Sequence, residues 1–129
     1  MEHDTLAAAL SNVMNHERVS KKTCTITPTS KVMKAVLKLL NSHNYIGVYE
    51  EYSETRGGYM RINLLGTINA VGAITPRFAV KVGDFEKYEK RFLPAKGVGV
   101  LIVSTNQGIM THLQAKESNL GGKLLAYCY

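Results

Sequence analysis

The first half of the chain alternates between helix-like and strand-like spacings of apolar residues. Apolar positions three and four residues apart predict a helix over residues 4–15, with Asp4 or Thr5 as its N-terminal cap. A second helix, over 31–42, is predicted after the turn-forming Pro28-Thr29-Ser30. Alternation with a period of two predicts strands over 22–27, 45–52 and 59–65, and the glycines within 53–58 suit a hairpin loop. This order predicts two helices covering one face of a three-stranded sheet.

The segment after these elements has a weaker pattern of apolar residues. Residues 66–75 are mostly small, include two glycines and form the candidate boundary between two lobes. Phe78, Val80 and Val82 alternate with other residue types and predict a strand. The next segment, 83–93, fits either a short helix or an irregular loop with a mixed-charge surface.

The last third of the chain predicts a β–loop–β element and a short helix. The nearly unbroken apolar run 98–103 is typical of a strand buried on both faces, and apolar residues resume after the polar loop 104–108. Thr111 and Gln114 have the spacing of a capping box, which predicts a helix to about Asn119 that Gly121-Gly122 stops.

The final strand, 123–129, completes the predicted fold. Leu124, Ala126 and Cys128 are expected to face one way, and Leu125, Tyr127 and Tyr129 the other. In the strand over 45–52, Ile46 and Val48 are likewise expected on one face. The fold class predicted is α+β with two small lobes. Residues 1–66 form the N-terminal α-β-α-β-β lobe, and residues 67–129 form a mainly-β lobe with one short helix.

Charge adds a preference for polyanionic partners. Sixteen Lys and Arg against ten Asp and Glu give the 129 residues a net charge of +6 and a pI near 9.4. Residues 67–129 hold eight bases and four acids, whereas 1–66 hold eight bases and six acids. The excess favours nucleic acid first and an anionic membrane second, although a basic protein without such a partner fits the composition equally well.

Composition and motifs weigh against catalysis, metal binding and membrane insertion. The apolar runs are too short to span a bilayer and the first residues lack the pattern of a secretory signal, so a cytoplasmic location is expected. The cysteines and histidines lack zinc-site spacing, and no cofactor is expected. Gly97-Val98-Gly99 precedes a strand rather than a helix, and Ser104 and His112 lack a nucleophile turn and an orienting acid. We predict that the protein is not an enzyme.

The polar loop 104–108 is the best candidate for binding. Ser104, Thr105, Asn106 and Gln107 each donate and accept hydrogen bonds, as the shallow minor groove of A-form RNA requires. Lys96, Lys116 and Lys123 could supply phosphate contacts. By itself the loop also fits an ordinary polar hairpin turn, and the lysine edge of the helix over 31–42, which includes Lys31, also fits a solvated face.

The stretch 97–129 resembles the carboxy-terminal half of the small-subunit ribosomal protein eight family. The motif is Ser104-Thr105-Asn106-Gln107-Gly108-Ile109-Met110-Thr111, followed by a short helix, Gly121-Gly122-Lys123 and the terminal Tyr127-Cys128-Tyr129. The likeness extends more weakly over nearly the whole chain, and the segment 74–78 is similar to the archaeal and eukaryotic branch.

This resemblance implies a ribosomal RNA-binding protein of the small subunit. Family members bind the central domain of the small-subunit RNA and help to assemble the platform beside neighbouring ribosomal proteins. Asn106 stands where the family has a third hydroxyl residue, and Lys123 stands where bacterial relatives commonly have an acid. The predicted RNA-binding residues are Ser104, Thr105, Asn106, Gln107, Gly108, Lys123, Arg77, Lys116 and Lys31. The alternative is a basic protein–protein interaction scaffold without direct RNA recognition.

Overall fold

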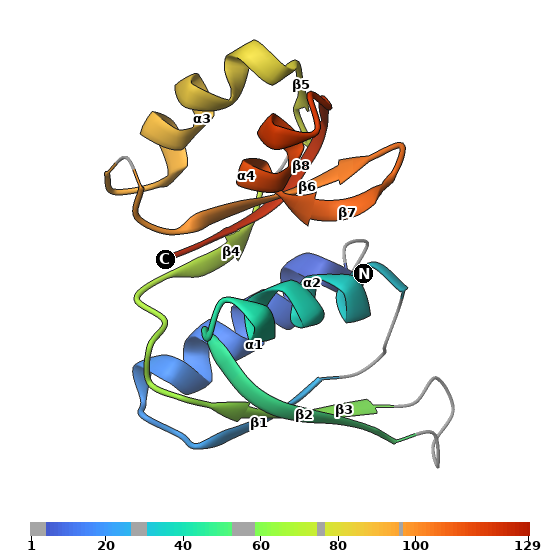
Figure 1. Ribbon diagram of the computed structural model, residues 1–129. Coiled ribbons are helices and arrows are strands. Elements are labelled where there is room, and N and C mark those ends of the chain that lie inside the picture. Colours follow the sequence, from blue (N-terminus) through green and yellow to red (C-terminus); the bar gives the residue numbers. More distant parts are fainter. Residues whose placement is uncertain (1–4, 27–30, 53–58, 75–76, 96) are drawn as a thin grey trace. The chain divides into compact units, whose positions relative to one another are not determined.

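The computed structural model of the chain has an α+β fold built from helices and antiparallel sheets (Figure 1), which confirms the predicted fold class. It describes residues 5–26, 31–52, 59–74, 77–95 and 97–129. The predicted cap Asp4, the turn 28–30, the loop 53–58 and Lys96 lie outside these residues. The chain divides into two compact units, Met1–Ile68 and Asn69–Tyr129. No helix in the described part is long and apolar enough to cross a membrane.

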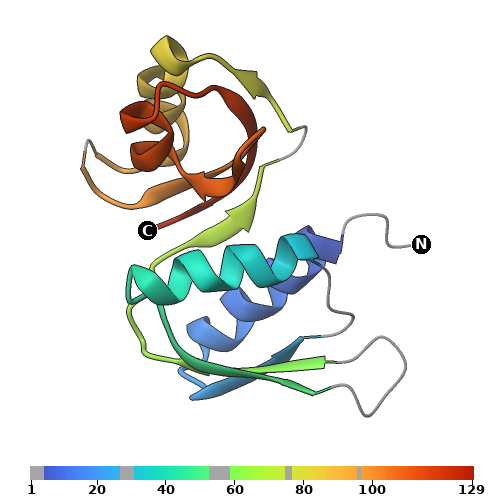
Figure 2. The ribbon, with the colours of Figure 1, turned by 45° about the vertical axis from the view of Figure 1, so that its right-hand side comes forward.

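The first unit places two helices on one face of a three-stranded sheet (Figures 1 and 2). Its elements are α1 (Thr5–Arg18), β1 (Thr23–Ile26), α2 (Lys31–Ser42), β2 (Ile46–Tyr52) and β3 (Tyr59–Leu64). The sheet has the order β1-β3-β2, with both pairs antiparallel. Cys24 is paired with Ile62 and Ile26 with Met60, and all four side chains are buried. The alternation of apolar residues therefore gives the sheet its inner face.

Two details of this unit differ from the predicted pattern. Helix α1 continues three residues beyond the predicted end at Asn15. In β2 the pairing with β3 shifts register between Ile46 and Tyr49. This irregularity breaks the period of two, so Ile46 is buried while Val48 is 66% exposed. The expectation that Ile46 and Val48 share a face is wrong for this reason.

The second unit is built on a sheet in the order β4-β8-β6-β7, with β5 also pairing with β8. Its elements are β4 (Val71–Ala73), β5 (Ala79–Val80), the 3-10 turn η1 (Val82–Asp84), α3 (Phe85–Phe92), β6 (Val100–Thr105), β7 (Gly108–Thr111), α4 (His112–Glu117) and β8 (Gly122–Cys128). The segment 83–93 is thus mainly helical, and β4 occupies part of the predicted boundary. Val82 belongs to η1, so the predicted strand over 78–82 is shorter than expected.

One core cluster joins α3, α4 and the sheet of this unit. Its buried members are Ile74, Val80, Phe85, Leu93, Leu101, Val103, Ala115 and Leu124. Figures 1 and 2 show α3 and α4 on the same side of the sheet. The sheet and both helices therefore share one core.

A β-bulge in the central strand β8 reverses its alternation. Ile102 pairs with Ala126 and Val103 pairs with Leu124, which leaves Leu125 as the extra residue. Leu124 consequently packs in the same cluster as Tyr127, not on the face of Ala126 and Cys128 as the simple alternation predicts. The bulge gives β8 three consecutive buried residues, 124–126.

The double glycine before β8 permits close approach to two neighbouring strands. A Cβ atom on Gly122 would lie 2.3 Å from the carbonyl oxygen of Ser104, and one on Gly121 would lie 2.6 Å from that of Val80. Helix α4 ends before these glycines, at Glu117, and Asn119 beyond it adopts a left-handed conformation with φ of 56°. The amides of Asn119 and Leu120 donate to the carbonyl oxygens of Lys116 and Ala115, respectively. This is the pattern of a Schellman motif. The glycines therefore serve strand packing, and the helix is terminated by Asn119.

We predict that Gly122→Ala lowers the free energy of unfolding by about 1–3 kcal/mol, because β8 must move away from Ser104 or strain its backbone. Urea unfolding followed by circular dichroism measures the change. Gly83→Ala is the matched control, since a Cβ there meets no described atom within 4 Å and should leave the unfolding midpoint nearly unchanged. Equal midpoints for the two variants would contradict the role assigned to Gly122.

Candidate nucleic-acid interface

The predicted polar loop is a tight hairpin at the end of β6 and β7. Ser104 pairs with Ile109 and Thr105 pairs with Gly108, so only Asn106 and Gln107 lie outside the ladder. Both are exposed, whereas Ser104 and Thr105 are half-buried. The polar side chains therefore divide into two held by strands and two presented at the turn.

The hydroxyl of Thr105 holds this turn in place. It donates to the carbonyl oxygen of Gly108 at 2.7 Å and accepts from the amide of Gln107 at 3.1 Å. A hydroxyl has one proton and two lone pairs, so one acceptor position remains for a ligand. The Thr105 hydroxyl therefore mainly stabilises the turn and has little capacity left to bind a ligand.

Gly108 is required for its backbone conformation. Its φ is +116°, and a Cβ atom would meet no described atom within 4 Å. Space is available for a side chain, but the conformation disfavours any residue other than glycine. The tight turn of the hairpin therefore depends on the hydroxyl of Thr105 and on the backbone conformation of Gly108.

Lys123 lies directly beside the hairpin. It pairs with Ser104 across β6 and β8, and with Ala79 across β5 and β8. Directly opposed residues project from the same face of a sheet, with Cβ atoms about 5 Å apart. The Lys123 side chain is exposed, so this end of the sheet offers an ammonium next to a hydroxyl.

The remaining basic candidates occupy different places. Arg77 is exposed and lies two residues before Ala79, the strand partner of Lys123. Lys31 is exposed at the start of α2, in the first unit. On the same helix, the ammonium of Lys34 lies 2.6 Å from the carboxylate of Glu51. The structure therefore gathers 104–108 and Lys123 on adjoining strands, with Arg77 two residues before β5, while Lys31 belongs to a separate unit.

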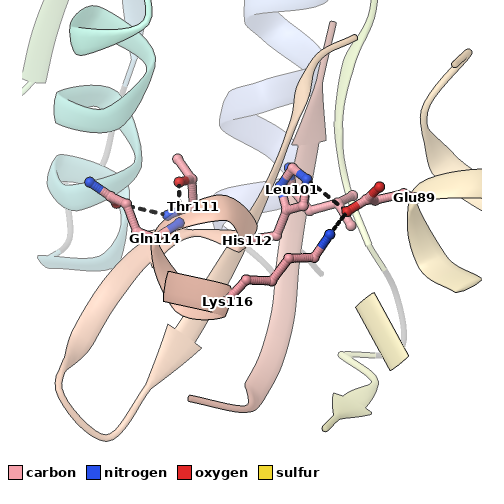
Figure 3. Close-up of polar contacts among 6 residues, drawn as sticks. All are labelled: Glu89, Leu101, Thr111, His112, Gln114 and Lys116. Atoms are coloured by element: carbon pink, nitrogen blue, oxygen red, sulfur yellow. Dashed lines mark hydrogen bonds and ion pairs between the residues drawn. The ribbon is translucent and has the colours of Figure 1, made fainter. Parts of the chain in front are cut away.

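Lys116 is already paired with a buried acid. Its ammonium contacts the carboxylate of Glu89 on α3, which is 6% exposed (Figure 3). The Nε2 atom of His112 lies 3.2 Å from the same carboxylate oxygen. Two residues of α4 are therefore tied to one acid of α3.

The hydrogen bonds of His112 define its neutral tautomer. The amide of Leu101 in β6 donates to Nδ1 at 3.0 Å, so Nδ1 must carry a lone pair. The proton then resides on Nε2 and is donated to Glu89 (Figure 3). His112 is only 3% exposed and links the backbone of β6 to α3. This arrangement serves packing, and the described contacts give His112 no role as a base for Ser104.

The predicted capping box at the start of α4 is confirmed. The amide of Gln114 donates to the hydroxyl of Thr111 at 3.3 Å, and the amide of Thr111 donates to the side-chain oxygen of Gln114 at 3.2 Å. Because Thr111 is also the last residue of β7, the cap connects the hairpin to α4 without a loop. The hairpin therefore leads directly into the helix whose His112 and Lys116 contact Glu89.

Residue patterns missed Glu89. The mixture of acids and bases over 83–93 suggested a charged surface, yet Glu89 lies on the buried side of α3. The signal is its spacing, since Phe85, Glu89 and Phe92 fall at i, i+4 and i+7 on one helical face. A charged residue inside an apolar stripe indicates a buried ion pair. Sequence spacing cannot identify the partner in that pair.

The chain was compared with models of known protein families. The family model described as ribosomal protein S8 matches residues 4–129 of the chain. The match includes both units and every element described above.

We predict that Glu89→Ala lowers the free energy of unfolding by about 3 kcal/mol, because Lys116 and the Nε2 proton of His112 lose their common partner. Glu89→Gln should cost less, since its amide oxygen still accepts from His112. Urea denaturation measures both. The control is Glu86→Ala, an exposed acid on the same helix, which should change stability by no more than about 0.5 kcal/mol. A similar loss for Glu86→Ala and Glu89→Ala would refute the anchoring role.

Proposed function

Because the chain belongs to the ribosomal protein S8 family, we propose that it binds the central domain of small-subunit ribosomal RNA and helps to organise the platform during assembly. The family implies the broader role directly. The protein is a structural, ribosome-associated component of the small subunit that binds ribosomal RNA, and the family is not one of enzymes.

The rigid polar hairpin is the observation that carries this proposal. Asn106 and Gln107 are exposed at a turn whose conformation Thr105 and Gly108 fix, so ordering them on RNA costs little entropy. Their amides, with the hydroxyl of Ser104, donate and accept hydrogen bonds. Ribose hydroxyls and base edges in the A-form minor groove require this combination.

The cations beside the hairpin complement this contact. Lys123 is exposed next to Ser104, and Arg77 belongs to the adjoining segment, so we assign phosphate contacts to both. Lys116 is expected to contribute less to RNA affinity because it already pairs with Glu89. We also propose that the two lobes, 1–66 and 67–129, act as domains and that the second carries the principal RNA site, while Lys31 is a candidate contact of the first.

We predict that Ser104→Ala combined with Asn106→Ala weakens binding to a central-domain RNA transcript about tenfold or more, because at least one buried hydrogen bond to RNA is lost. Fluorescence anisotropy with labelled transcripts measures the affinity. A generic RNA duplex is the control ligand, and its weaker binding should change little.

Two results would contradict the proposal. Equal losses on the cognate transcript and the generic duplex would mean that the hairpin confers no specificity. Unchanged binding to both would mean that it does not touch RNA, and retention of partner proteins after nuclease treatment would then favour a protein–protein scaffold.

We predict that Lys123→Ala lowers affinity for both RNAs and reduces the slope of log affinity against log salt by about 0.7–0.9, the value for one neutralised phosphate. Titrations at several salt concentrations measure the slope. Lys90→Ala removes the same charge from the exposed surface of α3 and should leave the slope unchanged. An unaltered slope for Lys123→Ala would show that this ammonium does not contact a phosphate.

A further inference from the structure

A continuous run of aromatic rings and one guanidinium crosses the second unit. We name it the aromatic–arginine strip, and its members are Phe78, Tyr88, Arg91, Phe92, Tyr127 and Tyr129. The ring centroids of Phe78 and Tyr88 lie 5.6 Å apart, those of Phe92 and Tyr127 lie 5.9 Å apart, and those of Tyr127 and Tyr129 lie 6.2 Å apart. The guanidinium carbon of Arg91 joins the two groups, at 5.0 Å from the Phe78 ring centre and 5.3 Å from that of Phe92.

Helix α3 supplies the middle of this strip. Tyr88, Arg91 and Phe92 are spaced i, i+3 and i+4, so they lie together on one flank of the helix. The rings are half-buried against the core cluster, while Arg91 is exposed. A guanidinium that rests on two rings and remains exposed presents its outer side and its N–H groups to solvent.

The charge of this flank is positive. Of the two acids within α3, Glu86 lies on the opposite flank, and Glu89 lies on the buried face, where it is bound to Lys116 and His112. Lys87 adds a second cation, with its ammonium 5.7 Å from the centre of the Tyr88 ring. Core packing accounts for the rings, but it does not require two cations placed over them.

Gly72 leaves space for the end of the strip. A Cβ atom at Gly72 would lie 2.9 Å from the hydroxyl oxygen of Tyr127, which is its strand partner across β4 and β8. The absent side chain lets the Tyr127 ring lie over β4 and stack between Phe92 and Tyr129. The strip is therefore a fixed surface whose rings and guanidinium are oriented before any ligand arrives.

We propose that the aromatic–arginine strip binds an unpaired nucleotide of RNA. The planar guanidinium of Arg91 would stack on the base and donate to a phosphate, and Lys87 would contact the same backbone. Unpaired bases are recognised by stacking on aromatic side chains and on arginine planes, and cations beside such rings attract the phosphates. This inference extends the proposed function to a second RNA contact of the same protein.

The strip and the hairpin are centred on different strands of the second unit's sheet. The hairpin ends β6 and β7, at one edge of the sheet, whereas the strip lies over β8 and β4 and includes Phe78 just before β5. Strands β4 and β7 are separated by β8 and β6, a distance of about 14 Å at about 4.8 Å per strand step. The strip is therefore suited to a single-stranded segment that is separate from the duplex at the hairpin.

Arg91→Gln and Lys90→Gln form a matched pair for testing this site. Both remove one exposed positive charge from neighbouring positions of α3, but Lys90 points away from the strip. The probes are short labelled oligoadenylate and oligouridylate, with affinities measured by fluorescence anisotropy. We expect Arg91→Gln to weaken oligoadenylate binding about tenfold, the loss typical of one stacked base, and to abolish its preference over oligouridylate. Lys90→Gln should have a much smaller effect and keep the preference.

Two further readouts separate stacking from charge and from misfolding. Arg91→Lys keeps the charge but lacks the planar group, so it should lose the preference for oligoadenylate while keeping part of the affinity. The chain has seven tyrosines, three of them in the strip, and no tryptophan, so quenching of tyrosine fluorescence by oligoadenylate reports a base placed close to a tyrosine ring. Thermal unfolding of each variant is compared with the parent protein to verify folding.

Several outcomes would overturn the proposal. The strip is not a base-binding site if the parent protein fails to bind either probe, if Arg91→Gln and Lys90→Gln lose affinity equally, or if tyrosine fluorescence is not quenched. If Arg91→Gln leaves probe binding intact but reduces incorporation into small subunits, the strip is a protein contact instead. Ser104→Ala with Asn106→Ala should leave oligoadenylate binding unchanged, so failure at the strip is distinguishable from failure at the hairpin.

Discussion

The second unit depends on the close approach of β8 to the strands on either side of it. At Gly122 the backbone of β8 comes so near to β6 that a Cβ atom would stand 2.3 Å from the Ser104 carbonyl oxygen. Gly121 likewise permits the backbone of β8 to approach β5 closely. Because β8 pairs with β4, β5 and β6, this contact lies on the strand that these three share. It also places Lys123 beside Ser104, so the positive charge at the hairpin results from strand packing and not from the flexibility of a long side chain.

A buried acid then fixes the helices that cover this sheet. Glu89 receives the Nε2 proton of His112 and the ammonium of Lys116, while the other ring nitrogen of His112 accepts from the backbone of β6. An ion pair in a core costs desolvation and adds little net stability compared with apolar packing, but it tolerates few alternative arrangements. The capping box at Thr111 joins the start of α4 to the last residue of β7. The hairpin is consequently supported from the side of α4 as well as by its own strands.

Local patterns in the sequence predict much of this fold, because short-range rules determine those parts. The helix over 31–42 begins and ends where apolar spacing places it, and the capping box of α4 forms between the residues that its spacing indicates. Long-range pairing determines what the patterns miss. The bulge at Leu125 reverses the alternation only because β6 pairs with β8 on both sides of it. The burial of Glu89 depends on partners 23 and 27 residues away, and the tight spacing that requires Gly122 is set by a strand that ends 17 residues earlier. Residue type alone identifies the candidate loop 104–108. The register of β6 and β7 is needed to show which of its polar side chains lie in the strands and which lie at the turn.

Strand β8 contributes to both surfaces that we assign to RNA. The two surfaces use different kinds of physical interaction. At its start Lys123 adjoins a turn of uncharged amides and hydroxyls, whose hydrogen bonds depend on geometry and are weakly affected by salt. Toward its end Tyr127 belongs to a row of rings with a guanidinium between them, where stacking tolerates many bases and the cations respond to salt. In our proposal, the first combination selects a particular folded RNA surface, and the second retains an unpaired segment that comes near. Since both surfaces are attached to one rigid strand, binding at the hairpin raises the local concentration of RNA at the strip, and a weak second contact then contributes to affinity without having to be specific.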